Sequence, residues 1–276
     1  MNNVAVNNKK KILYIIISVV VAAALLLMFD RRLQTTYYII ESDKIDSPIR
    51  IALITDFHSN DYGTDASKLV DAIQEASPDV VLLGGDIFDS NIPHTNARDF
   101  LKEISSLYPC YYVTGNHEYL SEVVDMLKEF VNSIGITVLD GKCSTISVNG
   151  QTLNICGVDD PVYSYDTMYS QLQTVSTASN NGHYTILLSH RPEMVDEYSR
   201  YSFDLVLSGH AHGGQFRIPY IINGVYAPHQ GFFPKYASGM YYIGNTTMIV
   251  SRGLDKEAIK LPRMFNRPEL AIIDLK

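Results

Sequence analysis

The chain has 276 residues, 46% of them hydrophobic, and a formal net charge of −8. This length is enough for one large domain with a substantial core, or for two small ones, and no charge block or low-complexity tract indicates disorder. The acidic balance disfavours a general electrostatic hold on nucleic acid, because phosphate contacts need clustered Lys and Arg. We therefore expect a folded globular protein with no nucleic acid among its partners.

The N-terminal segment is strongly apolar. Residues 12–29 contain nothing more polar than Tyr14 and Ser18, and lysines precede the run while arginines follow it. At a rise of about 1.5 Å per residue this run reaches about 27 Å, close to the hydrocarbon thickness of a bilayer. We expect a basic tail over 1–11, a single-pass transmembrane anchor over 12–29 and a juxtamembrane segment over 30–48.

A cleaved signal peptide is the alternative for this segment. The small residues Ala22, Ala23 and Ala24 lie inside the apolar run and not after it, which favours an uncleaved anchor. The excess of lysine on the N-terminal side favours an N-terminus inside the cell. The remainder of the chain is then expected outside the cytoplasm, at the cell membrane.

From residue 49 onward, apolar strands alternate with amphipathic helices. This alternation is typical of βαβ units around a buried, largely parallel sheet. After about residue 137 the sequence pattern changes from alternating strands and helices to mostly strands. Asn149–Gly150 is predicted as a hairpin turn, and the further strands suggest a second sheet packed on the first. We expect one α/β domain over 49–276. Helices are predicted over 65–77, 97–107 and 121–135, and strand-containing stretches over 49–58, 79–89, 110–119, 144–158, 184–192, 203–214, 239–254 and 269–275.

The three cysteines, Cys110, Cys143 and Cys156, are unevenly spaced and include no C-x-x-C pair. Their spacing indicates neither a zinc ribbon nor a disulfide framework. We expect three buried, small apolar side chains, with a single bridge between two of them as the alternative.

Polar side chains gather where the predicted strands end. In α/β sheets, ligands bind outside the carboxyl ends of the strands, so these residues are expected to lie close together. Singly, each has an ordinary explanation as a helix cap, a turn residue or a packed histidine. Together, at one sheet edge, they would be crowded without compensation unless a cation were bound. They are Asp56, His58, Asp86, Asn116, His117, His190, His210 and His212.

Imidazole and carboxylate are the ligands of Zn, Mn, Fe and similar divalent ions, and seven ligands are too many for one tetrahedral site. Two ions sharing a bridging carboxylate fit the count. Such a pair clamps a phosphoryl group for in-line displacement, so the pattern predicts hydrolysis of a phosphoester.

The motifs that carry these residues, D-x-H, G-D, G-N-H-E, a histidine after a strand and G-H-x-H, occur in this order between residues 51 and 216. In this order they resemble the calcineurin-like metallophosphoesterases. The resemblance implies two mixed sheets with helices on both outer faces, a four-layer α/β/β/α fold. It also implies that one ion is held by Asp56, His58 and His212, the other by Asn116, His190 and His210, with Asp86 bridging and His117 as general acid or oxyanion partner.

The C-terminal part resembles the membrane-associated bacterial branch that includes YkuE- and YaeI-type proteins, some of which hydrolyse the pyrophosphate of UDP-2,3-diacylglucosamine. The resemblance therefore implies a phosphorylated small molecule or a lipid-linked pyrophosphate as substrate. Nucleotides, phosphoproteins or a noncatalytic binding module on the same fold are the alternatives. One departure is Asp255-Lys256-Glu257 after the S-R-G-L stretch, where Gly and a small polar residue are expected, although this leaves the metal ligands untouched; Glu257 lies outside the residues that the structure describes.

Three further features bear on the substrate. Arg191 and Arg252 are candidate phosphate-binding residues, although structural ion pairs would also account for them. His229 is expected on the surface, within reach of substrate. The Tyr- and Phe-rich residues 216–242 are predicted either as strand and core packing or as an apolar mouth beside the metals that accepts an acyl chain or rests on the bilayer.

Overall fold

Two six-stranded sheets form the centre of the molecule. The computed structural model describes residues 2–218, 221–256 and 261–276. The first sheet has the strand order β1-β14-β2-β3-β4-β5, in which β2 to β5 are parallel and β14 runs antiparallel to β2. Its strands are β1 (Gln34–Ile40), β2 (Ile49–Ile54), β3 (Val80–Gly84), β4 (Cys110–Val113), β5 (Thr137–Val138) and β14 (Glu269–Leu275).

The second sheet is also mixed, with the order β12-β13-β9-β8-β7-β6. Strands β13, β9, β8 and β7 are parallel, and β12 and β6 close the two edges in the antiparallel sense. The strands are β6 (Lys142–Val148), β7 (Gln151–Gly157), β8 (Tyr184–Leu188), β9 (Leu205–Ser208), β12 (Gly239–Ile243) and β13 (Thr246–Val250). A small pair, β10 (Tyr226–Ala227) and β11 (Gly231–Phe232), stands apart from both sheets.

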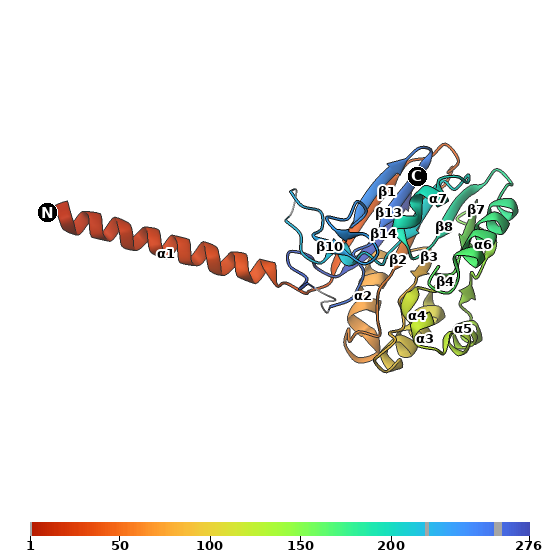
Figure 1. Cartoon of the computed structure of the whole chain (residues 1–276), viewed down its shortest axis with the longest axis horizontal. Coiled ribbons are helices and arrows are strands. Elements are labelled where there is room, and N and C mark those ends of the chain that lie inside the picture. Colours follow the sequence, from red (N-terminus) through yellow and green to blue (C-terminus); the bar gives the residue numbers. More distant parts are fainter. Residues whose placement is uncertain (1, 219–220, 257–260) are drawn as a thin grey trace.

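Helices cover the two outer faces, as Figure 1 shows. The central strands are apolar on both sides because one side meets the other sheet and the other side meets helices. Leu53, Leu82, Leu188 and Leu207 belong to the core between the sheets. The predicted four-layer α/β/β/α architecture is confirmed. On the first sheet lie α2 (Ser67–Ala76), α3 (Thr95–Leu107) and α5 (Val124–Ser133), and on the second lie α6 (Tyr165–Ala178) and α7 (Val195–Tyr198), while the short α4 (Asn116–Leu120) follows β4.

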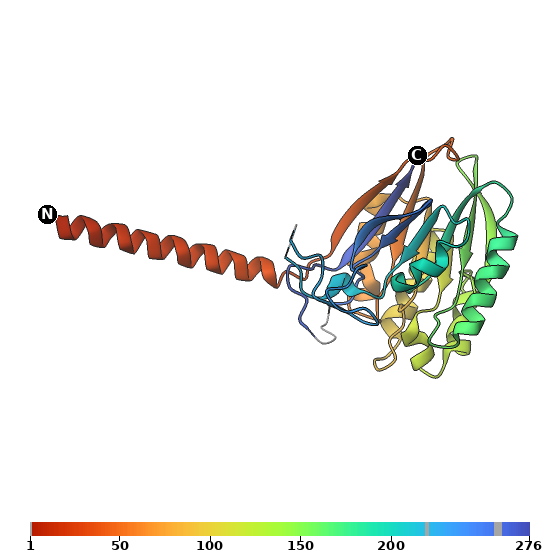
Figure 2. The same cartoon turned by 45° about the horizontal axis from the view of Figure 1, so that its top comes forward.

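The N-terminal helix α1 (Asn2–Met28) extends away from the domain (Figures 1 and 2). Within the described part of the chain, one stretch, Lys10–Met28, is long and apolar enough to cross a membrane, and none of it is buried. The segment expected as a juxtamembrane connection, 30–48, contains β1, which pairs in parallel with β14. The first sheet therefore begins before the predicted start of the domain at residue 49.

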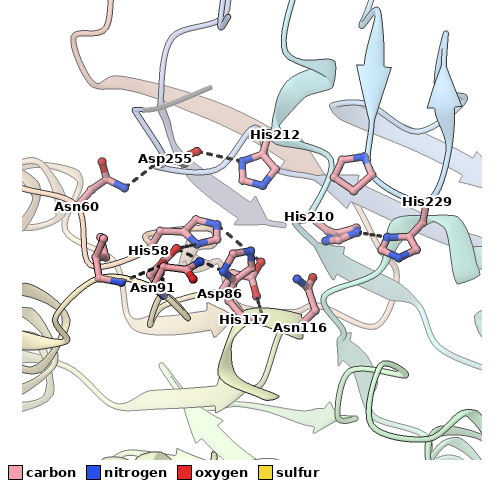
Figure 3. Close-up of a pocket in the computed structure, with 13 residues that line it drawn as sticks. His58, Asn60, Asp86, Asn91, Asn116, His117, His210, His212, His229 and Asp255 are labelled. Atoms are coloured by element: carbon pink, nitrogen blue, oxygen red, sulfur yellow. Dashed lines mark hydrogen bonds and ion pairs between the residues drawn. The ribbon is translucent and has the colours of Figure 1, made fainter. Parts of the chain in front are cut away.

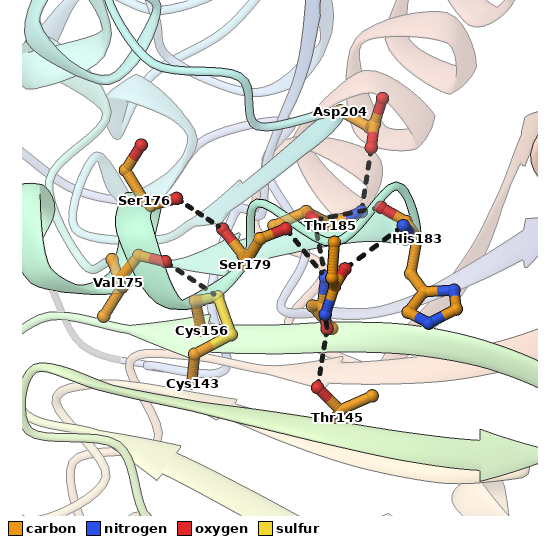
Figure 4. The surroundings of a disulfide bond; sticks show 11 residues. Cys143, Thr145, Cys156, Val175, Ser176, Ser179, His183, Thr185 and Asp204 are labelled. Carbon is orange, nitrogen blue, oxygen red and sulfur yellow. Dashed lines mark hydrogen bonds between the residues drawn. A yellow bond between two sulfur atoms is a disulfide. The ribbon is translucent and has the colours of Figure 1, made fainter.

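The expectation of three unpaired cysteines is wrong for two of them. Cys143 and Cys156 form a disulfide, shown in Figure 4, and Cys110 is a buried free thiol. The predicted hairpin turn at Asn149–Gly150 places the two cysteines directly opposite each other on β6 and β7. The register of this hairpin, which the spacing of cysteines alone does not reveal, brings the sulfur atoms together.

Candidate metal centre

The predicted site residues follow five strand ends. Asp56 and His58 follow β2, Asp86 follows β3, Asn116 begins α4 after β4, His190 follows β8, and His210 and His212 follow β9. Five of these residues have a left-handed backbone, with φ between 46° and 64°. Side chains disfavour this conformation, and such strain is retained mainly where the surrounding structure requires it. The five are Asp56, His58, Asp86, His210 and His212.

Two buried groups of three side chains lie next to each other. In the first, the ligand atoms of Asp56, His58 and His212 lie within 4.8 Å of one another. In the second, those of Asp86, His190 and His210 satisfy the same limit. Each group can therefore offer three donor atoms to one cation, and together they gather six of the seven predicted ligands.

Asp86 belongs to the second group and also faces His58 of the first. Its Oδ2 is 3.1 Å from Nε2 of His190 and 3.7 Å from Nε2 of His58. Its Oδ1 accepts a hydrogen bond from the backbone N–H of His117 at 2.8 Å, which holds the carboxylate in place. A carboxylate in this position can contribute to cation binding in both groups.

Hydrogen bonds on the outer side set the orientation of two imidazoles. Nδ1 of His190 lies 2.8 Å from the carbonyl oxygen of Gly84, and Nδ1 of His58 lies 3.1 Å from Oδ2 of Asp89. A proton on each Nδ1 leaves the Nε2 lone pair facing Asp86, as in histidines that bind metals.

Several buried donor atoms of the site have no hydrogen-bond partner among the described residues. A buried polar atom without a partner is costly, and a cation would satisfy all of these atoms at once. The residues present therefore fit a pair of divalent ions by donor type and by accessibility of the lone pairs. The atoms are Nε2 of His58, Nε2 of His190, Nδ1 of His210 and Oδ1 of Asn116.

The electrostatics of the site favour a cation. Burial opposes charging of both rings, but the bond to Asp89 and the charge of Asp86 raise the pKa of His58 to about 9, and Asp86 and Asp56 raise the pKa of His190 to about 10. Burial also raises the pKa of Asp56, which lies beside a second carboxylate. Positive charge is stabilised here, whether it is carried by protons or by metal ions.

A pocket of about 480 Å³ opens over the two groups. His117 is on its wall, with Nδ1 3.1 Å from Oγ of Ser90 and 3.3 Å from Oδ2 of Asp89. Its Nε2 is then the ring nitrogen left to meet a bound molecule. Figure 3 shows the side chains that line the pocket, with His58, Asp86, Asn116 and His117 facing His210, His212 and His229.

Sequence reasoning missed two carboxylates that hold this wall. Asp89 contacts the rings of both His58 and His117. Glu118, fully buried, accepts hydrogen bonds from the backbone N–H groups of residues 86, 87, 88 and 115. The G-N-H-E motif already contained Glu118, but only the fold shows that it fixes the loop carrying Asp86.

Close approach explains one glycine of the G-H-x-H motif. A Cβ at Gly209 would collide with the carboxylate of Asp56. The backbone N–H of His210 donates to that carboxylate at 2.9 Å and 3.1 Å. The loop after β9 can therefore approach the end of β2 only without a side chain at position 209.

The two candidate phosphate-binding arginines do not line the pocket. Arg191 is 2% exposed and forms a bidentate pair with Asp160, at 2.6 Å and 2.9 Å. Arg252 pairs with Glu269 at 3.2 Å in the adjoining sheet region. Both guanidinium groups are held by buried carboxylates, which the sequence could not reveal because the partners are distant in the chain: Asp160 follows β7 and Glu269 begins β14.

His229 is exposed, as expected, and it also lies on the rim of the pocket. Its Nδ1 is 2.9 Å from Nε2 of His210 and 2.6 Å from Nη1 of Arg191. Asp255 also lines the pocket, with Oδ2 3.7 Å from Nδ1 of His212. The departure after S-R-G-L therefore places a carboxylate beside a predicted ligand, while the ligand residues themselves are unchanged.

A two-sheet sandwich with paired His/Asp groups at the strand ends is the arrangement expected of a metal-dependent phosphoesterase. The sequence profile of the calcineurin-like phosphoesterases matches residues 49–214, and the chain belongs to this family. It is an enzyme of the metallophosphoesterase class, and the predicted resemblance is confirmed.

Named relatives agree with this assignment. The metallophosphoesterase YkuE of Bacillus subtilis is 28% identical over 253 residues, which cover 88% of this chain and 86% of YkuE. The phosphodiesterase YaeI of Escherichia coli is 27% identical over 236 residues, 83% of each chain. A dimetal phosphatase from Danio rerio shares the fold, with a TM-score of 0.50 and 16% identity over 76% of this chain and 89% of that one.

Proposed function

We propose that the protein is a single-pass, membrane-anchored hydrolase that uses two divalent cations to cleave phosphate esters or pyrophosphates, with lipid-linked phosphates as its substrate class. The observation that carries this proposal is the pair of adjacent buried groups with Asp86 between them and unpartnered imidazole nitrogens facing inward. The names of the relatives, a phosphodiesterase among them, support the reaction class.

In this proposal Asp56, His58 and His212 hold one ion, and Asn116, His190 and His210 hold the other, with Asp86 shared. When bound, two such cations supply a Lewis-acid clamp on the phosphate oxygens and activate water for in-line attack. Mn, Fe and Zn all suit this donor set. Backbone N–H groups hold two of the seven side chains in place. The N–H of His210 donates to Asp56, and the N–H of His117 donates to Asp86.

His117 completes the site. Its Nδ1 is engaged by Ser90 and Asp89, so Nε2 can donate a hydrogen bond or a proton to the leaving oxygen. The contact with Asp89 keeps that ring at the pocket wall. A developing alkoxide would thus meet a donor positioned before the reaction begins.

Two features support an anchored domain outside the cytoplasm. The stretch Lys10–Met28 can span a bilayer, and the Cys143–Cys156 disulfide is of a kind that persists in oxidising compartments. An enzyme in this position would meet phosphates carried by lipids in the plane of the membrane.

The direct test is hydrolysis of bis(p-nitrophenyl) phosphate by the full chain in detergent, stripped with EDTA and reconstituted with Mn²⁺. We expect two ions per chain by elemental analysis, and loss of turnover by about 100-fold or more in Asp86→Asn, equivalent to about 3 kcal/mol of barrier. The control is Asp274→Asn, which alters a carboxylate paired with Arg50 on the first sheet. Fewer than two ions in the parent protein would favour a noncatalytic binding module.

A substrate panel then separates the remaining alternatives. Lipid-linked pyrophosphates such as UDP-2,3-diacylglucosamine, soluble nucleotides and phosphoproteins are compared by kcat/KM at one metal concentration. A preference for nucleotides or phosphoproteins would contradict the lipid-linked substrate class while leaving the hydrolytic chemistry intact.

A further inference from the structure

Residues 216–218 and 221–236 form a lobe, which we call the apolar lobe, whose exposed apolar side chains take no part in the proposed hydrolysis. Ile221, Phe232 and Phe233 are 79%, 69% and 70% exposed. The ring of Phe232 is supported by Tyr226, with centroids 5.5 Å apart. One exposed apolar residue is ordinary, but several on one small lobe mark a surface that another apolar phase covers.

The apolar lobe lies beside the end of α1. The carbonyl oxygen of Met28 accepts a hydrogen bond from the N–H of Phe265 at 2.9 Å, and the neighbouring Met264 carbonyl accepts one from Arg217 at 3.0 Å. Met264 also forms a bridge with Phe216. Figures 1 and 2 both show the lobe, marked by β10 in Figure 1, at the end of the domain from which α1 extends.

Basic side chains are exposed at this end of the domain, although the chain as a whole is acidic. Arg31 and Arg32 follow α1 and are exposed, with Arg32 paired to Asp30 at 2.8 Å, and Lys235 is exposed two residues after Phe233. Aromatic residues flanked by basic ones are typical of segments that rest at the headgroup level of a bilayer containing anionic lipids.

The other side of the apolar lobe touches the metal pocket. Pro228 and His229 line the pocket. The N–H of Val225 donates to the carbonyl oxygen of Gly214 at 2.9 Å, so the lobe rests on the loop that carries His210 and His212. The lobe that exposes Phe232 and Phe233 therefore also shapes the entrance to the site.

We infer that the apolar lobe is a second membrane contact, in which Ile221, Phe232 and Phe233 enter the interfacial layer of the bilayer that α1 spans. The inference rests on the proposed anchoring by α1 and deepens the proposed function. This membrane contact holds the mouth of the metal pocket at the level of the lipid headgroups. The substrate class that this geometry serves is a phosphate group carried by a membrane lipid and reached from the bilayer side.

The chain contains no tryptophan, so one introduced indole reports on one position. Full-length Phe233→Trp is reconstituted into vesicles of phosphatidylcholine and phosphatidylglycerol, with or without bromine on the acyl chains. We expect a blue-shifted emission and a loss of about half of it in brominated vesicles, because interfacial segments lie about 5–10 Å into the acyl boundary.

The matched control is Tyr242→Trp. Tyr242 is 75% exposed, and it borders a cavity together with Ile39 and Ile40. These two residues lie at the C-terminal end of β1, whereas α1 precedes the N-terminal end of that strand. Its emission should be unshifted and unquenched. Ile221→Trp gives a second position in the apolar lobe if Phe233→Trp does not fold.

Absence of quenching at both lobe positions, or equal quenching at Tyr242→Trp, overturns the inference. A blue shift at Phe233→Trp without bromine quenching also overturns it, since a second copy or another protein would then cover the lobe. Flotation of the same vesicles tests anchoring by α1, and hydrolysis of bis(p-nitrophenyl) phosphate tests the chemistry. Failure of the lobe contact is thus distinguishable from failure of either proposed property.

Discussion

Nδ1 of His229 lies 2.9 Å from Nε2 of His210. Burial and the adjacent Arg191 lower the pKa of both imidazoles, so both are neutral near pH 7. A proton on Nε2 of His210, donated to His229, leaves the Nδ1 lone pair of His210 facing the site. We expect His229 to act as a positioning residue for this proposed ligand, together with Arg191, whose Nη1 lies 3.2 Å from the same nitrogen of His210.

We expect His229→Ala to weaken metal binding by about 10- to 100-fold, because the partner that orients His210 is lost. The measurement is competition for Mn²⁺ between the protein and a chelator, with kcat recorded at saturating metal. His183→Ala, which alters a histidine in the turn before β8, is the control. Unchanged affinity would remove His229 from the positioning role.

Asp89 offers a second test of the ring contacts, since it touches both His58 and His117. In Asp89→Asn we expect weaker metal binding through His58 and a lower kcat through His117, each by about 10-fold or more. Chelator competition reports the first effect and turnover at saturating metal reports the second. Asp99→Asn, in an ion pair with Lys102 on α3, should change neither. An effect on affinity alone would separate Asp89 from the function of His117.

Metal removal should destabilise the fold. A ligand at about 100 times its Kd adds about 2.7 kcal/mol to the free energy of unfolding. We therefore expect EDTA to lower the Tm of the full chain in detergent and Mn²⁺ to restore it. Asp86→Asn should show a smaller difference between the two conditions. An equal response in both proteins would place the stabilising ions elsewhere.

The disulfide predicts both a thiol count and a stability change. Without reductant, the unfolded chain should react with one equivalent of maleimide, at Cys110, and after reduction with three. Replacing the pair by Cys143→Ser with Cys156→Ser should lower the free energy of unfolding by about 3 kcal/mol, the value for a loop of about 15 residues. Three reactive thiols in protein isolated without reductant would contradict an oxidising location.

Stability should depend on pH through Asp159, whose Oδ1 is 2.8 Å from Nζ of Lys128. Burial disfavours ionisation, but Lys128 and hydrogen bonds from Gln171 and Thr114 lower the pKa of Asp159. A lowered pKa in the folded state stabilises the protein above the unfolded value of about 3.9, and this contribution is lost as the pH falls through the folded pKa.

We therefore expect Asp159→Asn to be less stable than the parent by about 2 kcal/mol at pH 7, with the difference shrinking below pH about 4. Urea unfolding with EDTA present measures it at each pH. Asp43→Asn, at an exposed carboxylate, should match the parent throughout. A difference that is constant with pH would show that the amide perturbs packing instead of charge.

Much of the architecture was predictable because it is written in local patterns. The run over residues 80–84 is wholly apolar and the run over 184–188 is mostly so, as is typical of strands buried on both faces, and the helices over 67–76 and 95–107 have one apolar side. Strand β1 was not predicted, because its partner β14 lies more than 200 residues away in the sequence. Helix α6 was also missed, since Ser, Thr and Gln dilute its apolar positions.

For the site, reading the residues alone was enough to single out the Asp, Asn and His side chains at the strand ends, because parallel strands present their carboxyl ends at one edge. The partners of those side chains became visible only when distant loops met. Asp89, Asp160 and His229 carry no motif, and their contacts depend on distances set by packing of the two sheets. The same holds for the disulfide and for the apolar lobe beside α1, because register and burial are properties of the folded chain.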